Sequence, residues 1–478
     1  MTVPVDRRRL LTGAAASLGV ASLGATLAGS RAFAAPARLT ALGDALDTAP
    51  RDLKSFDPRI VGDGRTDMTT RIAAALTSGA RHIVIPADAG AYVVDGSMTL
   101  PAGYGLTVQG RPGAVLLQRA LHERTLDGIG VDDCWIRDLK LSADYPRVYP
   151  GDRAFRGDNF YAGSSAIWLN GSRNRVTDVE IDGYVAGVWL SAWNGRENRV
   201  GSRGNLIERL RVSNVDMGIL IKGQTDTVVR QVRARDITLS PGSPNPQHTI
   251  YATGNEAFRS TNLTVSDIQT DNCPNSAPVQ IKFTDGFLGS NFVSDRAGAL
   301  NMISVRGFAV SGVTARRAQD QNGVGALVVG LQSGDGVTRS ADGTLDAVSL
   351  VMASEANRAI TAVGDRIRGR SVTVTMNRPA DNGAPDVSLA GRDSAWEIEL
   401  FNNGPGTGLG VEVRPRPGVE TDGMEVNLRR ANRARGALRV SPGATNTRLR
   451  YDRALVTTLP GRQLVVDGGS GTRVDPGA

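Results

Sequence analysis

A six-residue pattern recurs along the chain, first at residues 136–141, which read Ile-Arg-Asp-Leu-Lys-Leu. Each copy has an apolar residue, two polar residues, an apolar residue, a polar residue and, in most copies, a final apolar residue. Because successive side chains of a strand point to opposite faces, this alternation is typical of short strands that bury one face. The further copies are residues 176–181, 207–212, 229–234, 265–270 and 310–315.

The spacing of these copies is uneven. Their starts lie 40, 31, 22, 36 and 45 residues apart, so the shortest interval is close to twenty residues and the others contain insertions. A repeat of this length is typical of a solenoid, in which each turn rests on the next. Three of the copies follow an asparagine, as expected of runs that begin at turns, namely Asn174, Asn205 and Asn262.

A second series of apolar runs falls between the copies of the first. In each run the second and fourth residues are small or aliphatic and are expected to point inward, while the third and fifth point outward. Two strand series per turn predict an all-β fold, a single-stranded right-handed parallel β-helix that occupies residues 35–478 as one domain. The runs are residues 166–170, 187–191, 218–222, 249–253 and 278–282.

The composition agrees with many thin layers. The 478 residues are 40% hydrophobic and 22% charged, which is typical of a globular protein, yet only 5% are aromatic. The net charge is +7, but no basic run with interleaved aromatic residues occurs, so nucleic-acid binding is not predicted. Two cysteines are too few for a disulfide framework. Cys134 lies in an alternating stretch and is predicted to be a buried thiol rather than a partner of Cys273.

Residues 1–34 have the layout of a cleaved signal peptide. They combine a basic start, a weakly apolar stretch and the small-x-small end Ala32-Phe33-Ala34. Arg7-Arg8, followed by Arg9 and then by Leu10-Leu11, resembles the twin-arginine export motif, and an ordinary secretory signal is the alternative. Export to the periplasm or beyond the cell is therefore predicted. No later stretch is long and apolar enough to predict a membrane span.

The N-terminal region supports the fold by resemblance. Gly62-Asp63-Gly64-Arg65-Thr66-Asp67 leads into a helical stretch at residues 68–76, and short strand-like runs follow at residues 83–86, 92–94 and 106–110. This succession resembles the opening of the pectate-lyase-like superfamily, which includes polygalacturonases and many phage tailspikes. The resemblance implies a short capping helix within residues 55–115, with Asp63 and Asp67 as turn and cap residues. It does not imply one function, because the superfamily contains lyases, hydrolases, epimerases and binding proteins.

The outward residues of the second series predict a groove that would suit a linear polymer. His248 directly precedes one of these runs, and two of the chain's four lysines fall in one column. One predicted column is Trp168, Trp189, Leu220, Tyr251 and Gln280, and its neighbour is Asn170, Ser191, Lys222, Thr253 and Lys282.

These residue types favour β-elimination on a uronate-containing polysaccharide, without a metal or another cofactor. The reaction needs a base, a cation beside the carboxylate and an acid for the leaving oxygen. The hypothesis assigns His248 as the base, Tyr251 as the acid, and Lys222 and Lys282 as the cations, either of which could instead be the base. The predicted substrate-binding residues are Trp168, Asn170, Trp189, Ser191, Thr253 and Gln280.

Two other classes stay open. A glycoside hydrolase would need two carboxylates across the scissile bond, but the columns carry Trp189, Ser191, Leu220 and Lys222 where polygalacturonases have paired aspartates. The candidates to replace them are Asp152, Asp158 and Asp285. A non-catalytic polysaccharide-binding protein is the third class, and in that case the tryptophans could simply pack beneath the insertion at residues 145–163.

Overall fold

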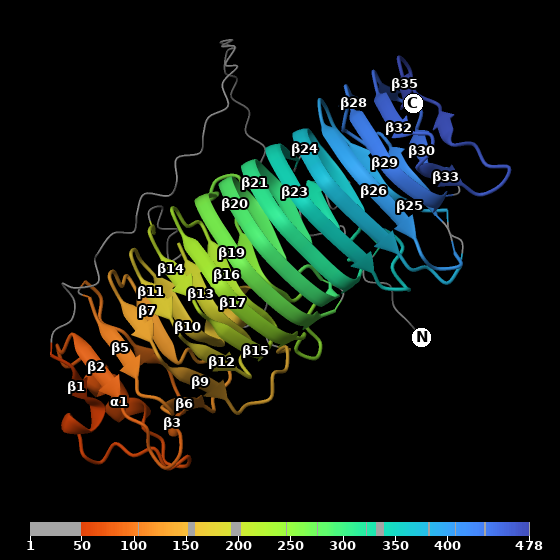
Figure 1. The fold of residues 1–478 in the computed structure, drawn as a ribbon. Coiled ribbons are helices and arrows are strands. Elements are labelled where there is room, and N and C mark those ends of the chain that lie inside the picture. Colours follow the sequence, from red (N-terminus) through yellow and green to blue (C-terminus); the bar gives the residue numbers. More distant parts are fainter. Residues whose placement is uncertain are drawn as a thin grey trace, which may run out of the picture. The chain divides into compact units, whose positions relative to one another are not determined.

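The computed structural model describes residues 49–477 except residues 104, 152–157, 193–201, 245, 275, 322, 331–338, 381–382, 407 and 435. The predicted signal peptide lies outside the described residues, and so does Asp152. The described part is a long coil of strands (Figure 1). None of the helices it contains is both long and apolar enough to cross a membrane.

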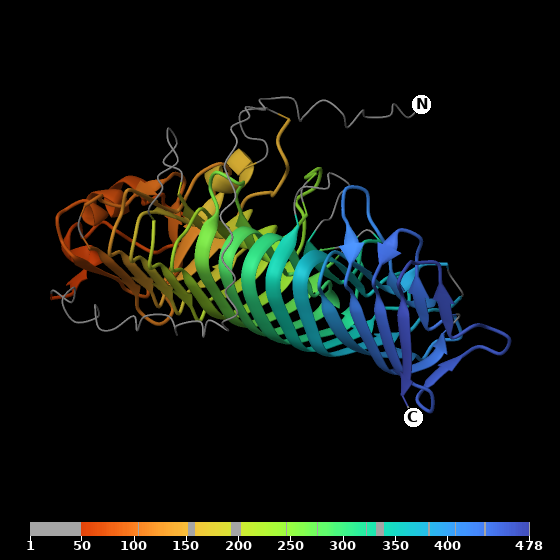
Figure 2. The same cartoon turned by 90° about the horizontal axis from the view of Figure 1, so that it is seen from above.

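Successive turns of the coil stack through parallel strand pairs. Strands β10, β11 and β12 (Ser165–Asn170, Arg175–Thr177 and Glu180–Asp182) pair in parallel with β13, β14 and β15 (Ala186–Ser191, Leu206–Glu208 and Arg211–Val215) of the next turn. Figure 2 shows the strands stacked side by side along the coil. Within the described residues, 33 strands form one continuous sheet. The predicted coil of parallel strands is therefore confirmed.

The strands before β10 build the first turns. They are β1 (Arg51–Asp52), β2 (His82–Ile85), β3 (Tyr92–Val94), β4 (Met98–Thr99), β5 (Thr107–Gly110), β6 (Val115–Gln118), β7 (Leu126–Ile129), β8 (Trp135–Arg137) and β9 (Lys140–Ala143).

The strands after β15 become longer in the middle of the coil. They are β16 (Met217–Lys222), β17 (Val228–Ile237), β18 (His248–Thr253), β19 (Ser260–Cys273), β20 (Val279–Ala297), β21 (Leu300–Ala318), β22 (Leu327–Gly330), β23 (Ser340–Met352), β24 (Ile360–Met376) and β25 (Pro385–Ala390).

The remaining strands close the described part of the coil. They are β26 (Ala395–Asn402), β27 (Leu409–Val413), β28 (Thr421–Asp422), β29 (Glu425–Ala434), β30 (Leu438–Val440), β31 (Ala444–Thr445), β32 (Arg448–Asp452), β33 (Val456–Thr458), β34 (Val465–Asp467) and β35 (Arg473–Gly477).

The six-residue pattern marks a corner of the coil rather than a straight strand. Its third residue has a left-handed backbone conformation, with φ of 54° at Asp138, 56° at Asp178 and 50° at Arg209. Such a residue turns the chain, so one copy of the pattern contains the end of β8 and the start of β9. Asparagine and aspartate tolerate this conformation better than most residues, which accounts for the polar third position.

The 45-residue interval at the end of the series contains a turn that the pattern missed. In β20, Gly289 pairs with both Val265 and Val310, so it occupies the first apolar position of an extra copy. The glycine has no side chain to fill the core there. The Phe292 ring fills this space, because a Cβ on Gly289 would lie 2.9 Å from its Cζ.

We expect Gly289→Val to destabilise the protein although valine restores the apolar pattern. The added side chain would collide with the buried Phe292 ring, and overpacking of this kind costs about 1–3 kcal/mol. Gly151→Val is the control, because a Cβ at Gly151 meets nothing within 4 Å. Urea unfolding measures both variants. Equal midpoints for the two would contradict the packing of Phe292.

The N-terminal cap agrees with its prediction. Helix α1 (Thr69–Leu76) follows a turn in which the Asp63 carboxylate accepts hydrogen bonds from the backbone of Arg65 and Thr66. The Asp67 carboxylate accepts from the backbone N–H of Thr69 at the helix start. A further short helix, α2 (Asp158–Gly163), lies in the insertion and was not predicted. A 3₁₀ turn, Leu53–Ser55, precedes α1 in the chain.

The core consists of the inward aliphatic residues of each turn, and both cysteines belong to it. Cys134 and Cys273 are free and fully buried, which confirms the predicted buried thiol. Two of the predicted turn asparagines, Asn174 and Asn205, are buried as well. Asn205 Oδ1 accepts from the backbone N–H of Asn174, whose own Oδ1 accepts from the N–H of Cys134, so the side chains tie neighbouring turns together.

Candidate functional site

The predicted outer columns exist as ladders in register. Trp168 pairs with Trp189, Trp189 with Leu220, Leu220 with Tyr251, and Tyr251 with Gln280. In the second column Lys222 lies between Ser191 and Thr253. The strand alternation therefore brought the predicted residues to one side of the coil.

Most of the first column is covered. Trp168 and Trp189 are each only 2% exposed, and the Arg124 guanidinium lies 3.4 Å from the centre of a Trp168 ring. Arg124 donates from Nε to the carbonyl of Ala162 in α2, so the insertion is tied down over this column. Trp168 thus packs beneath the insertion, which was the alternative interpretation, and neither tryptophan ring faces solvent for stacking on a sugar.

The other predicted polymer contacts divide between buried and accessible positions. Asn170, Ser191 and Gln280 are also buried. Gln280 accepts a hydrogen bond from Asn301 Nδ2 at 3.0 Å, within a buried ladder of amides. Thr253 is partly exposed.

His248 is completely enclosed. Its Nδ1 lies 2.7 Å from the carbonyl oxygen of Ala277 and 3.1 Å from Ser276 Oγ, both on the next turn. Burial lowers the pKa of the imidazole from 6.5 to about 3, so the ring is neutral near pH 7. The expectation that His248 meets the polymer directly does not fit this position, because no part of the side chain is exposed.

Tyr251 and the two lysines form the accessible part of the predicted site. Tyr251, Lys222 and Lys282 are each partly exposed. The Lys282 ammonium lies 5.4 Å from the centre of the Tyr251 ring, and the His248 ring lies 5.0 Å from it on the protein side. The Tyr251 ring therefore has both a buried neutral imidazole and a surface cation among its neighbours.

Carboxylates are scarce on this face. Asp285 is held by Arg259 through hydrogen bonds of 2.8 and 2.9 Å, and the side chain of Asp158 lies outside the described residues. Asp127 extends the first column by one turn, opposite Trp168, and burial raises the pKa of its carboxyl group. Among the described residues, no three His, Cys, Asp or Glu side chains are placed to hold a metal ion.

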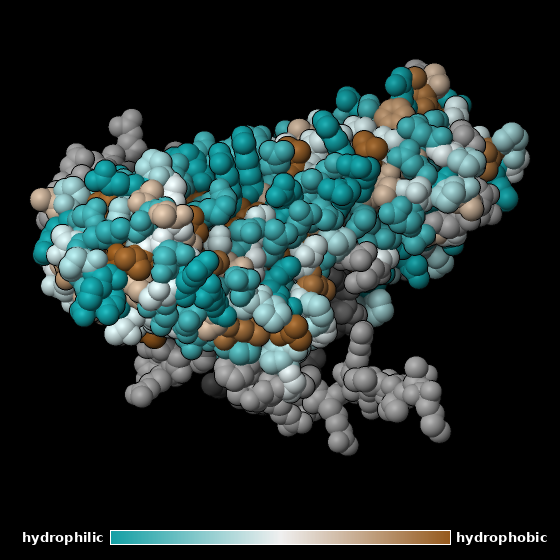
Figure 3. Space-filling model, turned by 90° about the horizontal axis from the view of Figure 1, so that it is seen from below, coloured by the Kyte–Doolittle hydropathy of each residue, from teal (hydrophilic) through white to brown (hydrophobic). Residues whose placement is uncertain are grey.

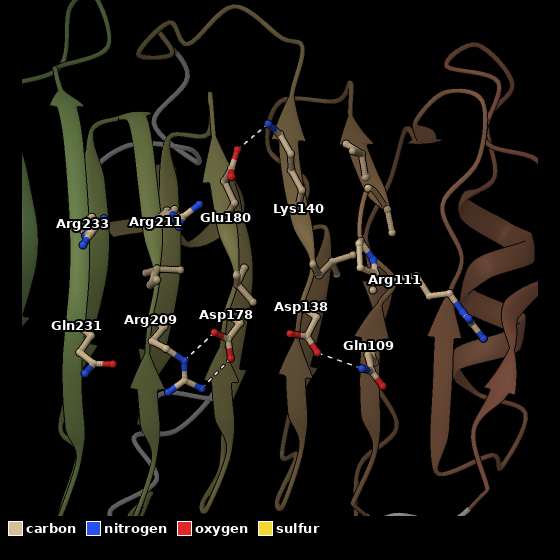
Figure 4. Close-up of a pocket in the computed structure, with 18 of the residues that line it drawn as sticks. Gln109, Arg111, Asp138, Lys140, Asp178, Glu180, Arg209, Arg211, Gln231 and Arg233 are labelled. Carbon is tan, nitrogen blue, oxygen red and sulfur yellow. Dashed lines mark hydrogen bonds and ion pairs between the residues drawn. The ribbon is translucent and has the colours of Figure 1, made fainter.

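A separate groove of about 1490 Å³ runs across the stacked corners. One wall is the column of left-handed residues, and the other is the ladder that starts each following strand. Figure 4 labels the main polar and charged lining residues, which project from successive strands. The face in Figure 3 is dominated by hydrophilic side chains. The first wall contains the left-handed residues Asp138, Asp178, Arg209 and Gln231 together with Gln109, and the second contains Lys140, Glu180, Arg211, Arg233 and Gln269.

Two ion pairs in the groove link residues of neighbouring turns of the coil. Arg209 donates to both oxygens of Asp178, at 2.6 and 2.7 Å, and this hydrogen bonding lowers the pKa of the Asp178 carboxyl group. Lys140 lies 2.6 Å from Glu180. The lowered pKa of Asp178 is the opposite of the raised pKa that a general acid needs.

Comparison with known proteins shows which solved structures share this fold. No family model and no curated protein sequence matches the chain. The tailspike protein of E. coli bacteriophage HK620, solved with a hexasaccharide, matches 88% of this chain and 80% of its own at 9% identity, with a TM-score of 0.53. The chain is a right-handed parallel β-helix.

Two further solved structures resemble this β-helix less closely. The Agl-KA catalytic domain covers 90% of this chain and 69% of its own, at 12% identity and a TM-score of 0.45. A mutant of DFA-IIIase from Arthrobacter chlorophenolicus A6 covers 87% and 98%, at 10% identity and a TM-score of 0.46.

The corner groove of the β-helix is the feature that sequence reasoning missed. Its signal was present, because the third residue of the six-residue pattern is polar in every early copy and includes Asp138 and Asp178. Lys140, one of the chain's four lysines, belongs to the groove as well. The pattern was interpreted as one straight strand, so these side chains were not assigned to a concave corner.

Proposed function

We propose that this protein is an exported, carbohydrate-active β-helix that cleaves a uronate-containing polysaccharide by β-elimination at the surface formed by Tyr251, Lys222 and Lys282. The observation that carries the proposal is the accessible phenol of Tyr251 with the Lys282 ammonium 5.4 Å from its ring centre. The tailspike of similar fold was solved with a hexasaccharide, which supports a saccharide as the ligand class. The signal predicted in residues 1–34 supports export.

The chemistry follows from the charges at this surface. The carbon beside the uronate carboxylate loses its proton, the electron pair forms a double bond, and the bond to the leaving oxygen breaks. Tyr251 donates its phenolic proton to that oxygen, and the nearby charge of Lys282 stabilises the phenolate that remains. Because His248 is enclosed, the proton from carbon passes to the uncharged amine of Lys222, one of the two lysines that were the alternative bases, while Lys282 keeps its charge.

The lysines also recognise the substrate. Lys222 and Lys282 lie two turns apart on either side of the Thr253 turn, which corresponds to about 10 Å at the usual spacing of parallel strands. A uronate lying between them would have its carboxylate within reach of a cation, whereas a neutral sugar would gain nothing from the lysines.

We expect Tyr251→Phe to lower turnover of a uronate polymer by about 10²-fold or more, because the leaving oxygen loses its proton donor. Lys282→Ala should mainly weaken binding of the charged polymer. Ultraviolet absorbance of unsaturated products measures the reaction, and Tyr451→Phe, on β32, is the control. Full activity of Tyr251→Phe would rule out this site.

The same assay separates the other two classes. New reducing ends without ultraviolet absorbance would identify a glycoside hydrolase, for which Asp127 with its raised pKa is the candidate acid. Binding without either product would identify a non-catalytic polysaccharide-binding protein.

A further inference from the structure

The corner groove differs from the Tyr251 surface in residues and in charge. Its lining includes none of Tyr251, Lys222 and Lys282. It crosses successive turns of the coil, so a ligand that fills it must be extended along the stack. A spacing of about 4.8 Å between turns gives such a ligand a repeated set of contacts.

The carboxylates of the groove already have partners. Asp178 accepts from Arg209 and Glu180 lies against Lys140. Asp138 accepts from Gln109 Nε2 at 3.0 Å, and Asp267 accepts from Asn291 Nδ2 at 2.9 Å. These contacts leave the carboxylates little need of a cationic ligand.

Three of the groove's arginines, unlike Asp178 and Glu180, have no ionic partner among the described residues. Arg111, Arg211 and Arg233 line the groove and are exposed, and none of them forms an ion pair with another described residue. Arg211 and Arg233 are direct neighbours in register on β15 and β17. Guanidinium groups bind carboxylates through paired hydrogen bonds, so two adjacent arginines can hold successive acidic groups of one ligand.

We propose that the corner groove is a second binding site, which takes an extended anionic polysaccharide. This proposal relies on the proposed function for the class of polymer and adds a site that holds the chain away from the Tyr251 surface. The paired carboxylates favour a polysaccharide over a nucleic acid. Sugar hydroxyl groups can donate hydrogen bonds to Asp138, Asp178 and Glu180, whereas the phosphodiester groups of a nucleic acid have no hydrogen-bond donor to offer these carboxylates.

The test is binding of polygalacturonate by the full chain and by the double variant Arg211→Ser/Arg233→Ser. We expect the double variant to bind about tenfold more weakly at low salt, since two exposed charge pairs are lost. Arg235→Ser is the matched control, because Arg235 lies on the same strand, is exposed and does not line the groove. The control variant should bind as the unchanged protein does.

Neutral dextran and a single-stranded DNA oligonucleotide complete the design. Unchanged polygalacturonate binding by the double variant would overturn the proposal, and so would tighter binding of DNA than of polygalacturonate in this groove. The Tyr251→Phe variant, measured in parallel, should bind normally. If the double variant loses polymer binding but still cleaves short oligosaccharides, the groove is a binding site separate from the site of cleavage. If the unchanged protein cleaves nothing but its binding depends on Arg211 and Arg233, only the proposed elimination is refuted.

Discussion

At pH 8, where the Asp386 carboxyl group is ionised, Asp386→Ala is expected to lower the free energy of unfolding by about 3–5 kcal/mol, because it leaves a buried positive charge unpaired. Arg378 Nη1 lies 2.5 Å from Asp386 Oδ1, and the two side chains are 2% and 0% exposed. Removal of one member of such a pair is costly, while replacement of both by apolar residues is often neutral. Arg378→Met/Asp386→Leu should therefore recover most of the stability.

The control is a surface pair of the same chemistry. Asp342 accepts from Arg366 through two hydrogen bonds, but both side chains are about half exposed. Asp342→Ala should cost less than about 1 kcal/mol, because water replaces the lost partner. Denaturant unfolding measures all the variants. If Asp386→Ala lowers the free energy of unfolding no more than Asp342→Ala does, Arg378 is not left as an unpaired buried charge.

His248 should make the protein sensitive to acid. The unfolded imidazole binds a proton below about pH 6.5, whereas the enclosed one does so only near pH 3. Between these values the unfolded state binds more protons, so the stability present above pH 6.5 is lost as the pH falls. The loss amounts to about 4 kcal/mol at pH 3, from 1.4 kcal/mol for each unit of pKa difference.

The matched variant is His248→Gln, which does not titrate and can still donate a hydrogen bond to Ala277. Its stability should lack this part of the pH dependence. The comparison with the unchanged protein is essential, because Asp386 acts in the opposite direction. Burial raises the pKa of its carboxyl group to about 7, so the folded state holds that proton and loses stability as the pH rises from about 4 to 7. Identical slopes in the two proteins would contradict the enclosed imidazole.

The candidate site was partly predictable from the sequence. Alternation of side chains along a strand is a local property, so it correctly aligned Trp168 with Trp189, and Lys222 with Thr253. The same alternation says nothing of what covers an outer face. Contact of Arg124 with Trp168, and with α2 above it, joins segments far apart in the chain, and no periodicity reports such a contact.

The sequence by itself determined the class of fold. Each short run has one apolar side, and these runs repeat over the chain. A stack of parallel turns is the arrangement that buries all of those apolar residues. Gly289 shows the limit of this rule, because a turn whose apolar position is filled by Phe292 is invisible to the pattern. Only the tertiary structure decided that His248 is enclosed and that Arg211 and Arg233 face an open groove. Exposure depends on which insertions fold back over a turn and on how sharply each corner bends, and those are contacts between distant residues.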